Sequence, residues 1–251
     1  MRTWLLGVPV DGVTMESALE RVGQWLGQPQ GRTRIVLTPN PEVIMEAARD
    51  PALAALFRAA DLALPDGVGV VWALRHARQP VAGRVPGVEF MMALLGLAAT
   101  GTFRVFFLGA RPEVLAKAVR QATQRFPGLL VAGQRDGFYP PEEEEEVVRG
   151  IRDAGADILL VGMGSARQHA FLARHREDLG VGVAMAVGGS LDVLADESRR
   201  APEAWRRAGL EWLWRLLQEP WRWRRQLALP RFAASVVLRG SAAVRPDPPE
   251  R

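Results

Sequence analysis

The sequence predicts an α/β fold in which an open, mostly parallel sheet has helices on both faces and an amphipathic helical appendage follows at the carboxyl end. Short apolar runs alternate with stretches whose apolar residues recur at helical spacing, a rhythm typical of parallel strands joined by right-handed crossovers. Several of these runs end in Gly, Pro or small polar residues directly before a helical stretch. A chain of 251 residues with 48% apolar and 24% charged residues can bury the core that this fold needs.

The first part of the chain supplies buried strands and the helices around them. A strand is expected near 5–10, and Thr14 is placed to cap a helix that extends to Leu26. The continuous apolar runs at 34–38 and 62–65 predict buried strands. Helices are expected at 41–49, 51–59, 68–78 and 87–99, and the Pro- and Gly-containing segment 79–87 predicts a loop that lies over the strand ends.

The second part alternates more regularly. Strands are expected at 104–108, 129–132, 157–161 and 182–187, separated by helices at 112–125, 141–153 and 166–177. The resulting sheet is Rossmann-like, and ligands of such sheets bind in a crevice at the carboxyl ends of the strands. The glutamates at 142–146 are interpreted as a solvated first helical turn, which the positive end of the helix dipole favours.

Absent residues and motifs exclude several classes of protein. The chain has no cysteine, which rules out disulfides and thiolate chemistry and fits a reducing compartment such as the cytoplasm. It contains no Gly-x-x-x-x-Gly-Lys-Ser/Thr, His-Glu-x-x-His, Gly-x-Ser-x-Gly or complete Gly-x-Gly-x-x-Gly motif. Asp-x-Asp is also absent, so arginines, backbone N–H groups or a helix terminus would have to hold a diphosphate leaving group. No apolar segment approaches about 20 residues, so neither a signal peptide nor a spanning helix is expected.

Polar side chains at two strand ends are candidates for chemistry. Thr38 and Asn40 follow one predicted strand and Asp66 follows the next, which would bring a hydroxyl, an amide and a carboxylate into one crevice. Asp66 is a candidate general base, because a carboxylate there can take a proton from an attacking hydroxyl. The alternative is that Asp66 and Asn40 are turn or helix-capping residues. Arg84, in the loop, is either a phosphate ligand or a solvated surface arginine.

Glycine-rich turns follow four strands of the second part. Glycine lets the backbone approach a phosphate while the next helix points N–H groups at it, although tight turns need glycine for their own reasons. Four such turns along one sheet edge favour a nucleotide-sized ligand. The candidate residues in and beside these turns are Gly109, Asp136, Gly137, Phe138, Gly162, Gly164, Gly188, Gly189 and Asp192.

The character of the chain changes at about residue 199. Ten arginines and three glutamates lie between 199 and 239, a local charge of +7; since the whole chain carries +4, the remainder carries −3. Five of the eight tryptophans lie between 205 and 223, partly on an apolar helical stripe and partly in Trp221-Arg-Trp-Arg-Arg225. Such a stripe is usually core or subunit interface. Alternating Trp and Arg instead favours binding to an anionic membrane surface.

Nucleic acid is a further possible partner of the same region. Interleaved Arg and aromatic residues also suit nucleic acid, but the acidic remainder and the lack of a recognition motif argue against it, and no nucleic-acid partner is expected. The domain prediction is therefore a catalytic α/β domain at 1–198, a membrane-surface appendage at 199–239 and a disordered tail at 240–251.

The order of these motifs resembles the WecG/TagA/CpsF glycosyltransferases from about residue 5 to 235. The elements that carry the resemblance are Thr38-Pro-Asn-Pro-Glu42, Asp66-Gly-Val-Gly-Val-Val-Trp-Ala73, Arg84-Val-Pro-Gly87, Phe107-Leu-Gly109, Asp136-Gly-Phe138, Gly162-x-Gly164 with Gln168, Val187-Gly-Gly189 with Asp192, Arg200-Ala-Pro202 and Gly209-Leu-Glu-Trp-Leu-Trp-Arg215. Nine such elements, spaced along the chain in one order, make this resemblance specific.

The resemblance implies an inverting, metal-independent and cofactor-free glycosyltransferase. Its donor would be UDP-N-acetylmannosamine or a related UDP-hexose, and its acceptor N-acetylglucosamine on a polyprenyl diphosphate, in the synthesis of cell-surface polysaccharide or of the teichoic-acid linkage unit. The resemblance implies that Asp66 is the general base, that Thr38 and Asn40 position the sugars, and that Arg84 and Gln168 line the same pocket. The glycine turns and Asp192 would hold UDP.

The resemblance also assigns a role to the basic segment. It implies that the chain from about residue 202 docks on the inner face of the cytoplasmic membrane and that homo-oligomers and monomers exchange as it moves. Arg215, Arg222 and Arg225 would close over the diphosphate, with Trp221 and Trp223 at the membrane surface.

One departure affects the donor. The family usually has Pro-Lys-Gln-Glu after the Gly-x-Gly turn, whereas this chain has Ala166-Arg-Gln-His169, so an imidazole replaces an acid. Two alternatives stay open: a non-catalytic protein that binds nucleotide sugars or lipid headgroups, and a transferase with another donor or acceptor.

Overall fold

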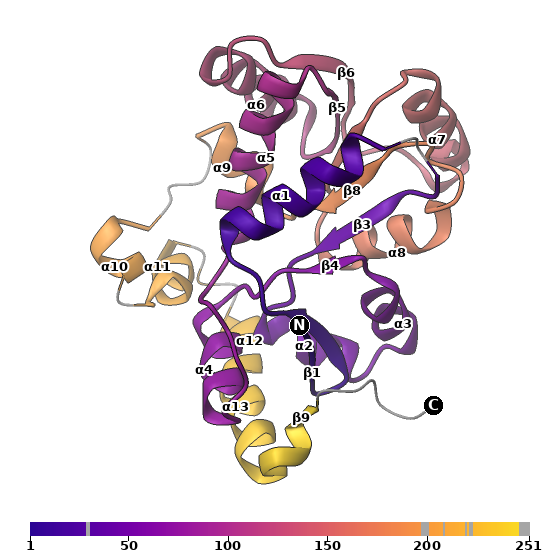
Figure 1. Cartoon of the computed structure of the whole chain (residues 1–251). Coiled ribbons are helices and arrows are strands. Elements are labelled where there is room, and N and C mark those ends of the chain that lie inside the picture. The colour runs from indigo at the N-terminus through magenta and orange to yellow at the C-terminus, as the bar shows by residue number, and fades with distance from the viewer. Residues whose placement is uncertain (29–30, 197–200, 208, 219, 221–222, 246–251) are drawn as a thin grey trace.

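The computed structural model describes residues 1–28, 31–196, 201–207, 209–218, 220 and 223–245. Its strands form a six-stranded sheet and a smaller three-stranded sheet. Figure 1 shows the larger sheet between two sets of helices, with the carboxyl-terminal helices along one side.

All neighbouring strands of the six-stranded sheet are parallel, in the order β4-β3-β8-β7-β5-β6. The strands are β3 (Arg34–Leu37), β4 (Leu62–Ala63), β5 (Arg104–Gly109), β6 (Leu130–Arg135), β7 (Ile158–Gly162) and β8 (Val183–Ala186). This arrangement confirms the predicted open parallel α/β fold. The strand predicted at 129–132 starts one residue later and continues to Arg135.

Two layers of helices cover the sheet. One layer contains α1 (Met15–Leu26), α5 (Gly87–Gly101), α6 (Pro112–Arg125) and α9 (Ser190–Leu194), and the other contains α2 (Pro41–Ala47), α3 (Pro51–Ala59), α4 (Val68–His76), α7 (Glu144–Asp153) and α8 (Ser165–His175). Successive residues of a central strand divide between the layers: Ile158 and Leu160 pack with the first, Leu159 and Val161 with the second. The strands are therefore apolar on both faces, as their continuous apolar runs indicated.

Local signals explain where several helices begin. Thr14 and Ser17 form a capping box at the start of α1, each side chain bonding to the other residue's backbone N–H. Asp50 caps α3 by accepting from the N–H groups of Ala52 and Leu53. A proline occupies the first position of α2, α3 and α6, where its missing N–H costs nothing.

The single strand predicted near 5–10 is wrong. Residues there form a hairpin of β1 (Arg2–Leu5) and β2 (Val8–Asp11), which pair antiparallel. The two turn residues, Leu6 and Gly7, have φ values of +50° and +87°, as a two-residue hairpin turn with positive φ at both positions requires. The third strand of this sheet, β9 (Val244–Arg245), comes from the far end of the chain and pairs with β1.

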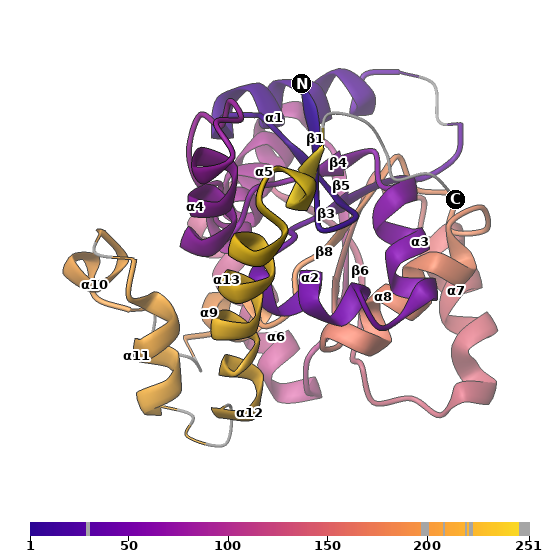
Figure 2. The ribbon, with the colours of Figure 1, turned by 90° about the horizontal axis from the view of Figure 1, so that it is seen from below.

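The carboxyl-terminal region ends the appendage earlier than the predicted residue 239, because its last long helix packs into the body. It contains α10 (Glu203–Arg207), α11 (Glu211–Gln218), α12 (Trp223–Gln226) and α13 (Ala228–Arg239). In Figure 2, α10 and α11 stand apart from the body, whereas α13 lies along it. Phe232 and Val236 of α13 are 2% and 1% exposed in the same core as α2 and α4, so α13 belongs to the body. We call α10 to α12 the appendage below.

The segment predicted as a disordered tail is ordered at its start. Gly240–Ala243 form a 3₁₀ turn and lead into β9, in which Val244 is 5% exposed. Pairing with β1 satisfies the backbone here, and a two-residue strand carries too little pattern to be detected. Residues 246–251 lie outside the described part. Within that part, no helix is both long and apolar enough to cross a bilayer.

Candidate active site

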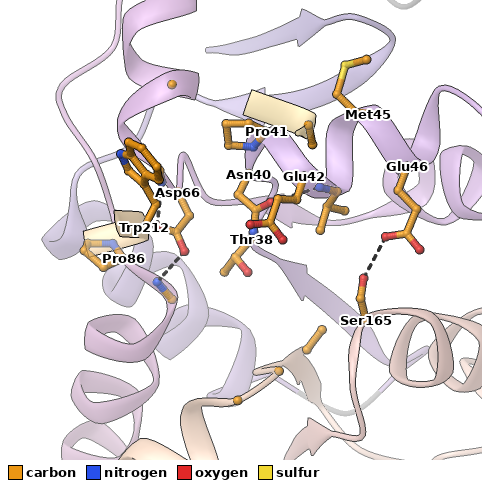
Figure 3. Close-up of a pocket in the computed structure, with 18 of the residues that line it drawn as sticks. Thr38, Asn40, Pro41, Glu42, Met45, Glu46, Asp66, Pro86, Ser165 and Trp212 are labelled. Atoms are coloured by element: carbon orange, nitrogen blue, oxygen red, sulfur yellow. Dashed lines mark hydrogen bonds between the residues drawn. The ribbon is translucent and has the colours of Figure 1, made fainter. Parts of the chain in front are cut away.

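A pocket of about 860 Å³ opens at the carboxyl ends of β3, β4, β7 and β8. The helices that follow β3 and β7 lie on one face of the sheet and α9, which follows β8, lies on the other. Chains that diverge in this way leave a crevice between strand ends. Figure 3 shows Asp66 and Trp212 at one end of the pocket, Glu46 and Ser165 at the other, and Thr38 between them.

The pocket wall unites most of the residues predicted for the site. They come from five separate segments of the chain, which only the parallel topology brings together. The predicted residues in the wall are Thr38, Asn40, Asp66, Arg84, Gly162, Gly164, Gln168, Gly188, Gly189 and Asp192.

Asp66 lies just beyond β4, and its carboxylate accepts three hydrogen bonds. Oδ1 accepts from the N–H of Gly67 at 2.7 Å and from Nε of Arg84 at 3.1 Å, and Oδ2 accepts from the N–H of Gly87 at 3.2 Å. The side chain is 20% exposed. Oδ2 accepts only that one bond among the described residues, so it retains acceptor capacity for a substrate hydroxyl.

Arg84 is fixed beside Asp66 by the loop between α4 and α5. The N–H of Val85 donates to the carbonyl of Pro65 at 2.8 Å, which holds the loop against the strand end. The guanidinium also donates through Nη2 to Glu211 of the appendage at 2.8 Å. Burial disfavours its charged form, but the carboxylates of Asp66 and Glu211 outweigh burial and raise the pKa of Arg84. Arg84 is therefore not the solvated surface residue of the alternative interpretation.

Asn40 combines a structural role with a place in the pocket. Its Oδ1 caps α2 by accepting from the N–H of Val43 at 3.0 Å, as the turn interpretation expected. Its Nδ2 makes no bond that the described residues show, so it can donate into the pocket, where Asn40 is part of the wall. Thr38 lies beside Gly87, because a Cβ on that glycine would be 3.5 Å from the Thr38 hydroxyl and 3.6 Å from Oδ2 of Asp66.

Gln168 fixes one of the glycine turns. It is 5% exposed on α8, and its Oε1 accepts from the N–H of Gly188 at 3.0 Å. Gly188 has φ +52° and Gly164, which precedes α8, has φ +82°, both in the region that favours glycine. Both glycines line the pocket, so the N-terminus of α8 faces the same space as the turn after β8, an arrangement suited to an anion.

Four predicted residues lie outside the pocket wall. Gly109 has φ +126°, and a Cβ there would be 2.2 Å from the carbonyl oxygen of Gly162, so strand packing alone requires glycine. Gly137 packs on Gly109, with a Cβ position 3.2 Å from its Cα. Asp136 closes a turn by accepting from the N–H of Phe138, whose side chain is 71% exposed. Nucleotide binding by these residues stays a prediction, and the structure gives three of them a local packing or turn role.

Most of the residues predicted for membrane and diphosphate binding lie where the structure describes no side chain. Trp221 and Arg222 lie outside the described residues, as do the side chains of Arg215 and Arg225. Trp223 is 53% exposed.

Residues of the carboxyl-terminal helices that sequence reasoning missed also line the pocket. Trp212 belongs to its wall, and Gln226 joins the wall by donating to Glu42 of α2 at 3.2 Å. Arg231 of α13 reaches the same wall. Only tertiary packing brings them there, so no local signal marks them.

A second polar group lies at the far end of the pocket. The Ser165 hydroxyl donates to Oε2 of Glu46 at 3.1 Å and lies 3.5 Å from Nδ1 of His169. His169 is 6% exposed and packs edge-on against Phe57. The position of Glu46, one turn after Glu42 on α2, was a signal that could have located it. Among the residues that the structure describes, no three His, Cys, Asp or Glu side chains form a metal-binding group.

His169 is expected to make stability depend on pH below neutrality. Burial lowers its pKa from 6.5 to about 4. The unfolded chain therefore binds this proton as the pH falls through 6.5, while the folded chain stays neutral down to about 4, so stability falls across that window. The loss at pH 5 is about 2 kcal/mol. Urea unfolding at pH 7.5 and at pH 5 should show the full loss of stability in the wild type and only a small part of it in His169→Gln. An equal loss in both proteins would contradict the assignment.

Comparison with known proteins identifies the family. The model of the family described as "Glycosyl transferase WecG/TagA/CpsF family" matches residues 3–245. A Bacillus spizizenii protein named N-acetylglucosaminyldiphosphoundecaprenol N-acetyl-beta-D-mannosaminyltransferase is 35% identical over 217 residues, which cover 86% of this chain and 84% of that protein. Proteins of the same name from Bacillus subtilis and Staphylococcus aureus (strain MW2) are 32% identical over 81% of this chain and 78% of theirs, and 34% identical over 93% and 91%, respectively. This chain belongs to the WecG/TagA/CpsF family of glycosyltransferases.

Proposed function

We propose that this chain transfers N-acetylmannosamine, or a closely related hexose, from UDP to N-acetylglucosamine on a polyprenyl diphosphate, with inversion and without a metal ion. The observation that carries the proposal is the position of Asp66, a partly exposed carboxylate at the open edge of a parallel sheet, in a pocket large enough for a nucleotide sugar. The names of the relatives support the choice of sugar and acceptor.

The proposed reaction is a single displacement. The acceptor hydroxyl oxygen forms a bond to the anomeric carbon as the bond from that carbon to the UDP oxygen breaks. Asp66 takes the hydroxyl proton, and the electron pair of the broken bond leaves on the β-phosphate. The N-terminus of α8 at Gly164 and the turn at Gly189, whose neighbour Gly188 is held by Gln168, offer N–H groups to that diphosphate. One base and one displacement give inversion at the anomeric carbon.

The association with a membrane rests on the exposed apolar side chains of the appendage. Leu217 and Trp223 are 62% and 53% exposed, on a segment whose arginines suit anionic headgroups. We place the enzyme peripherally at the inner face of the cytoplasmic membrane. There, the sugar of a membrane-anchored polyprenyl acceptor would lie close to the pocket.

Transfer by the purified chain tests this function. UDP release from UDP-N-acetylmannosamine should require a polyprenyl-diphosphate N-acetylglucosamine analogue, persist in excess chelator, and rise when the acceptor is embedded in anionic rather than neutral vesicles. NMR of the product should show the β-linkage. Loss of release in chelator would contradict metal independence, and release with a different UDP-hexose alone would change the donor. Binding of UDP-sugars with no transfer from any donor would favour the non-catalytic alternative.

A further inference from the structure

Glu46 places a carboxylate at the end of the pocket opposite Asp66. Figure 3 shows its side chain reaching from α2 toward Ser165 of α8. Oε2 accepts from the Ser165 hydroxyl at 3.1 Å, whereas Oε1 accepts no hydrogen bond from the residues that the structure describes. Arg49 and Arg231 also line the pocket, but within the described part of the chain neither bonds to Glu46. Glu46 therefore offers the pocket a negative charge and an acceptor atom.

Two other carboxylates lie in the same part of the wall, and each is bonded to a different element. Glu42, one turn earlier on α2, accepts from Gln226 at the end of α12. Asp50 caps α3. Glu46 differs from both because its partner belongs to α8, whose N-terminus lines the pocket.

Ser165 connects Glu46 to the proposed diphosphate site. It is the first residue of α8 and directly follows Gly164, the N-cap residue, which has no side chain with which to cap the helix. The proposed function places the diphosphate of UDP at this helix terminus, so Glu46 lies one side chain away from it. The donor sugar begins one bond beyond the β-phosphate. Glu46 therefore borders the space that the donor sugar would occupy.

The pocket thus offers opposite electrostatic environments to the two parts of a donor. The N-terminus of α8 and the turn at Gly189 favour an anion. Glu46 favours an O–H or N–H donor and opposes a second anion. His169, 3.5 Å from the Ser165 hydroxyl, does not offset this charge, because burial lowers its pKa to about 4 and it is neutral at pH 7. An anionic diphosphate joined to an uncharged sugar matches both environments.

We infer that Glu46 is a specificity-determining residue, which accepts a hydrogen bond from an O–H or N–H group of the donor sugar and rejects a sugar that carries a carboxylate. Ser165 holds the Glu46 carboxylate in place for this contact. The donor is then an uncharged sugar rather than the corresponding uronic acid. This inference rests on the proposed function, because it assumes that a nucleotide sugar binds with its diphosphate at α8.

Calorimetry without acceptor tests this selection independently of turnover. The ligands are UDP, UDP-N-acetylmannosamine and UDP-N-acetylmannosaminuronic acid, and the two sugars differ only at C6, which carries a hydroxyl in one and is a carboxylate in the other. The wild type should bind the uncharged sugar about tenfold to a hundredfold more tightly than the acid, since like charges repel in a partly buried site. In Glu46→Gln this ratio should shrink by about tenfold, whereas the affinity for UDP should not fall.

Two further variants separate charge from position. Glu46→Asp keeps the negative charge and should keep the preference against the uronic acid. Glu42→Gln is the matched control, because it removes a carboxylate of the same wall one turn earlier on α2. It should leave the preference within about threefold of the wild type, since Coulomb repulsion weakens with distance.

Transfer assays with the two donors provide the second readout. The ratio of kcat/KM for the uncharged sugar to kcat/KM for the uronic acid should shrink in Glu46→Gln by the same factor as the binding ratio, because the lost interaction is with the donor. Each donor is assayed with the same polyprenyl-diphosphate N-acetylglucosamine analogue.

The outcomes separate this inference from the proposed function. A wild type that prefers the uronic acid, or a preference unchanged in Glu46→Gln, would overturn the inference, while transfer of the uncharged sugar would leave the proposed function standing. A fall in UDP affinity in Glu46→Gln would show that the carboxylate binds the nucleoside, and would also overturn it. A preference that depends on Glu46, in a protein that transfers neither sugar, would support the inference and reject the proposed function.

Discussion

Replacing Asp66 with asparagine is expected to lower the rate of sugar transfer by about a thousandfold, the middle of the range for loss of a general base. The amide cannot accept the proton of the acceptor hydroxyl. In the wild type the N–H of Gly67 lies 2.7 Å from Oδ1 and the N–H of Gly87 lies 3.2 Å from Oδ2. The amide oxygen can still accept from Gly67, but the NH₂ group would face the N–H of Gly87. Acceptor-dependent UDP release, measured at saturating and low donor, should show the loss mainly in kcat.

The control for that loss is another carboxylate of the same pocket. Glu42 bonds to Gln226 and has no place in the proposed proton transfer, so Glu42→Gln should stay within about threefold of the wild type. Donor affinity, measured by calorimetry without acceptor, should be similar in Asp66→Asn and wild type. If Asp66→Asn transfers sugar as fast as Glu42→Gln, Asp66 is only a turn residue and another group is the base.

The location of the site followed from the sequence because strand ends are marked locally. Asp66 and Asn40 each follow a short apolar run, and a parallel sheet carries all such ends to one edge. The structural and functional interpretations of these residues are not exclusive. Asn40 caps α2 with its oxygen while its NH₂ group remains for the pocket, and Asp66 organises Gly67 and Gly87 as a turn residue would.

The sequence could not show which glycines serve a ligand. Gly109 ends β5 and Gly188 follows β8, and the two look alike in the sequence, yet a Cβ on Gly109 would collide with Gly162 whereas Gly188 has open space around its Cβ position. The difference lies in backbones from other strands, which no local pattern records. The segment predicted as a membrane-surface appendage was ambiguous for a related reason: Phe232 in it is buried by protein, and a membrane would also select apolar side chains.

Contacts between segments far apart in the chain could not be predicted from the sequence either. The pairing of β9 with β1 joins the two ends of the described chain, and the bond from Arg84 to Glu211 spans 127 residues. The hairpin at the amino end did carry a signal in Gly7. The turn was missed because the preceding residue is Leu6, whose φ of +50° is uncommon for a residue other than glycine.

Asp61 is expected to contribute more to the free energy of unfolding than any exposed ion pair does. Its Oδ2 accepts from Arg176 at 2.5 Å and from the N–H of Ile35 at 2.8 Å, and its side chain is 15% exposed. Arg176 also donates to the carbonyls of Thr33 and Ala59, so the pair ties the end of α8 to the segments before β3 and β4. Asp61→Asn would leave a buried guanidinium without its counter-charge.

We expect Asp61→Asn to lower the free energy of unfolding by about 3 kcal/mol, the lower end of the range for breaking a buried pair. Arg32→Gln removes the second guanidinium that bonds to the Asp61 carboxylate, one that is 61% exposed, and should cost less than about 1 kcal/mol. Urea unfolding of both variants measures the difference. Equal losses would mean that solvent screens both pairs alike. Because Arg176 also satisfies two carbonyls, adding Arg176→Met to Asp61→Asn should recover only part of the loss, whereas full recovery would show that the uncompensated charge was the whole cost.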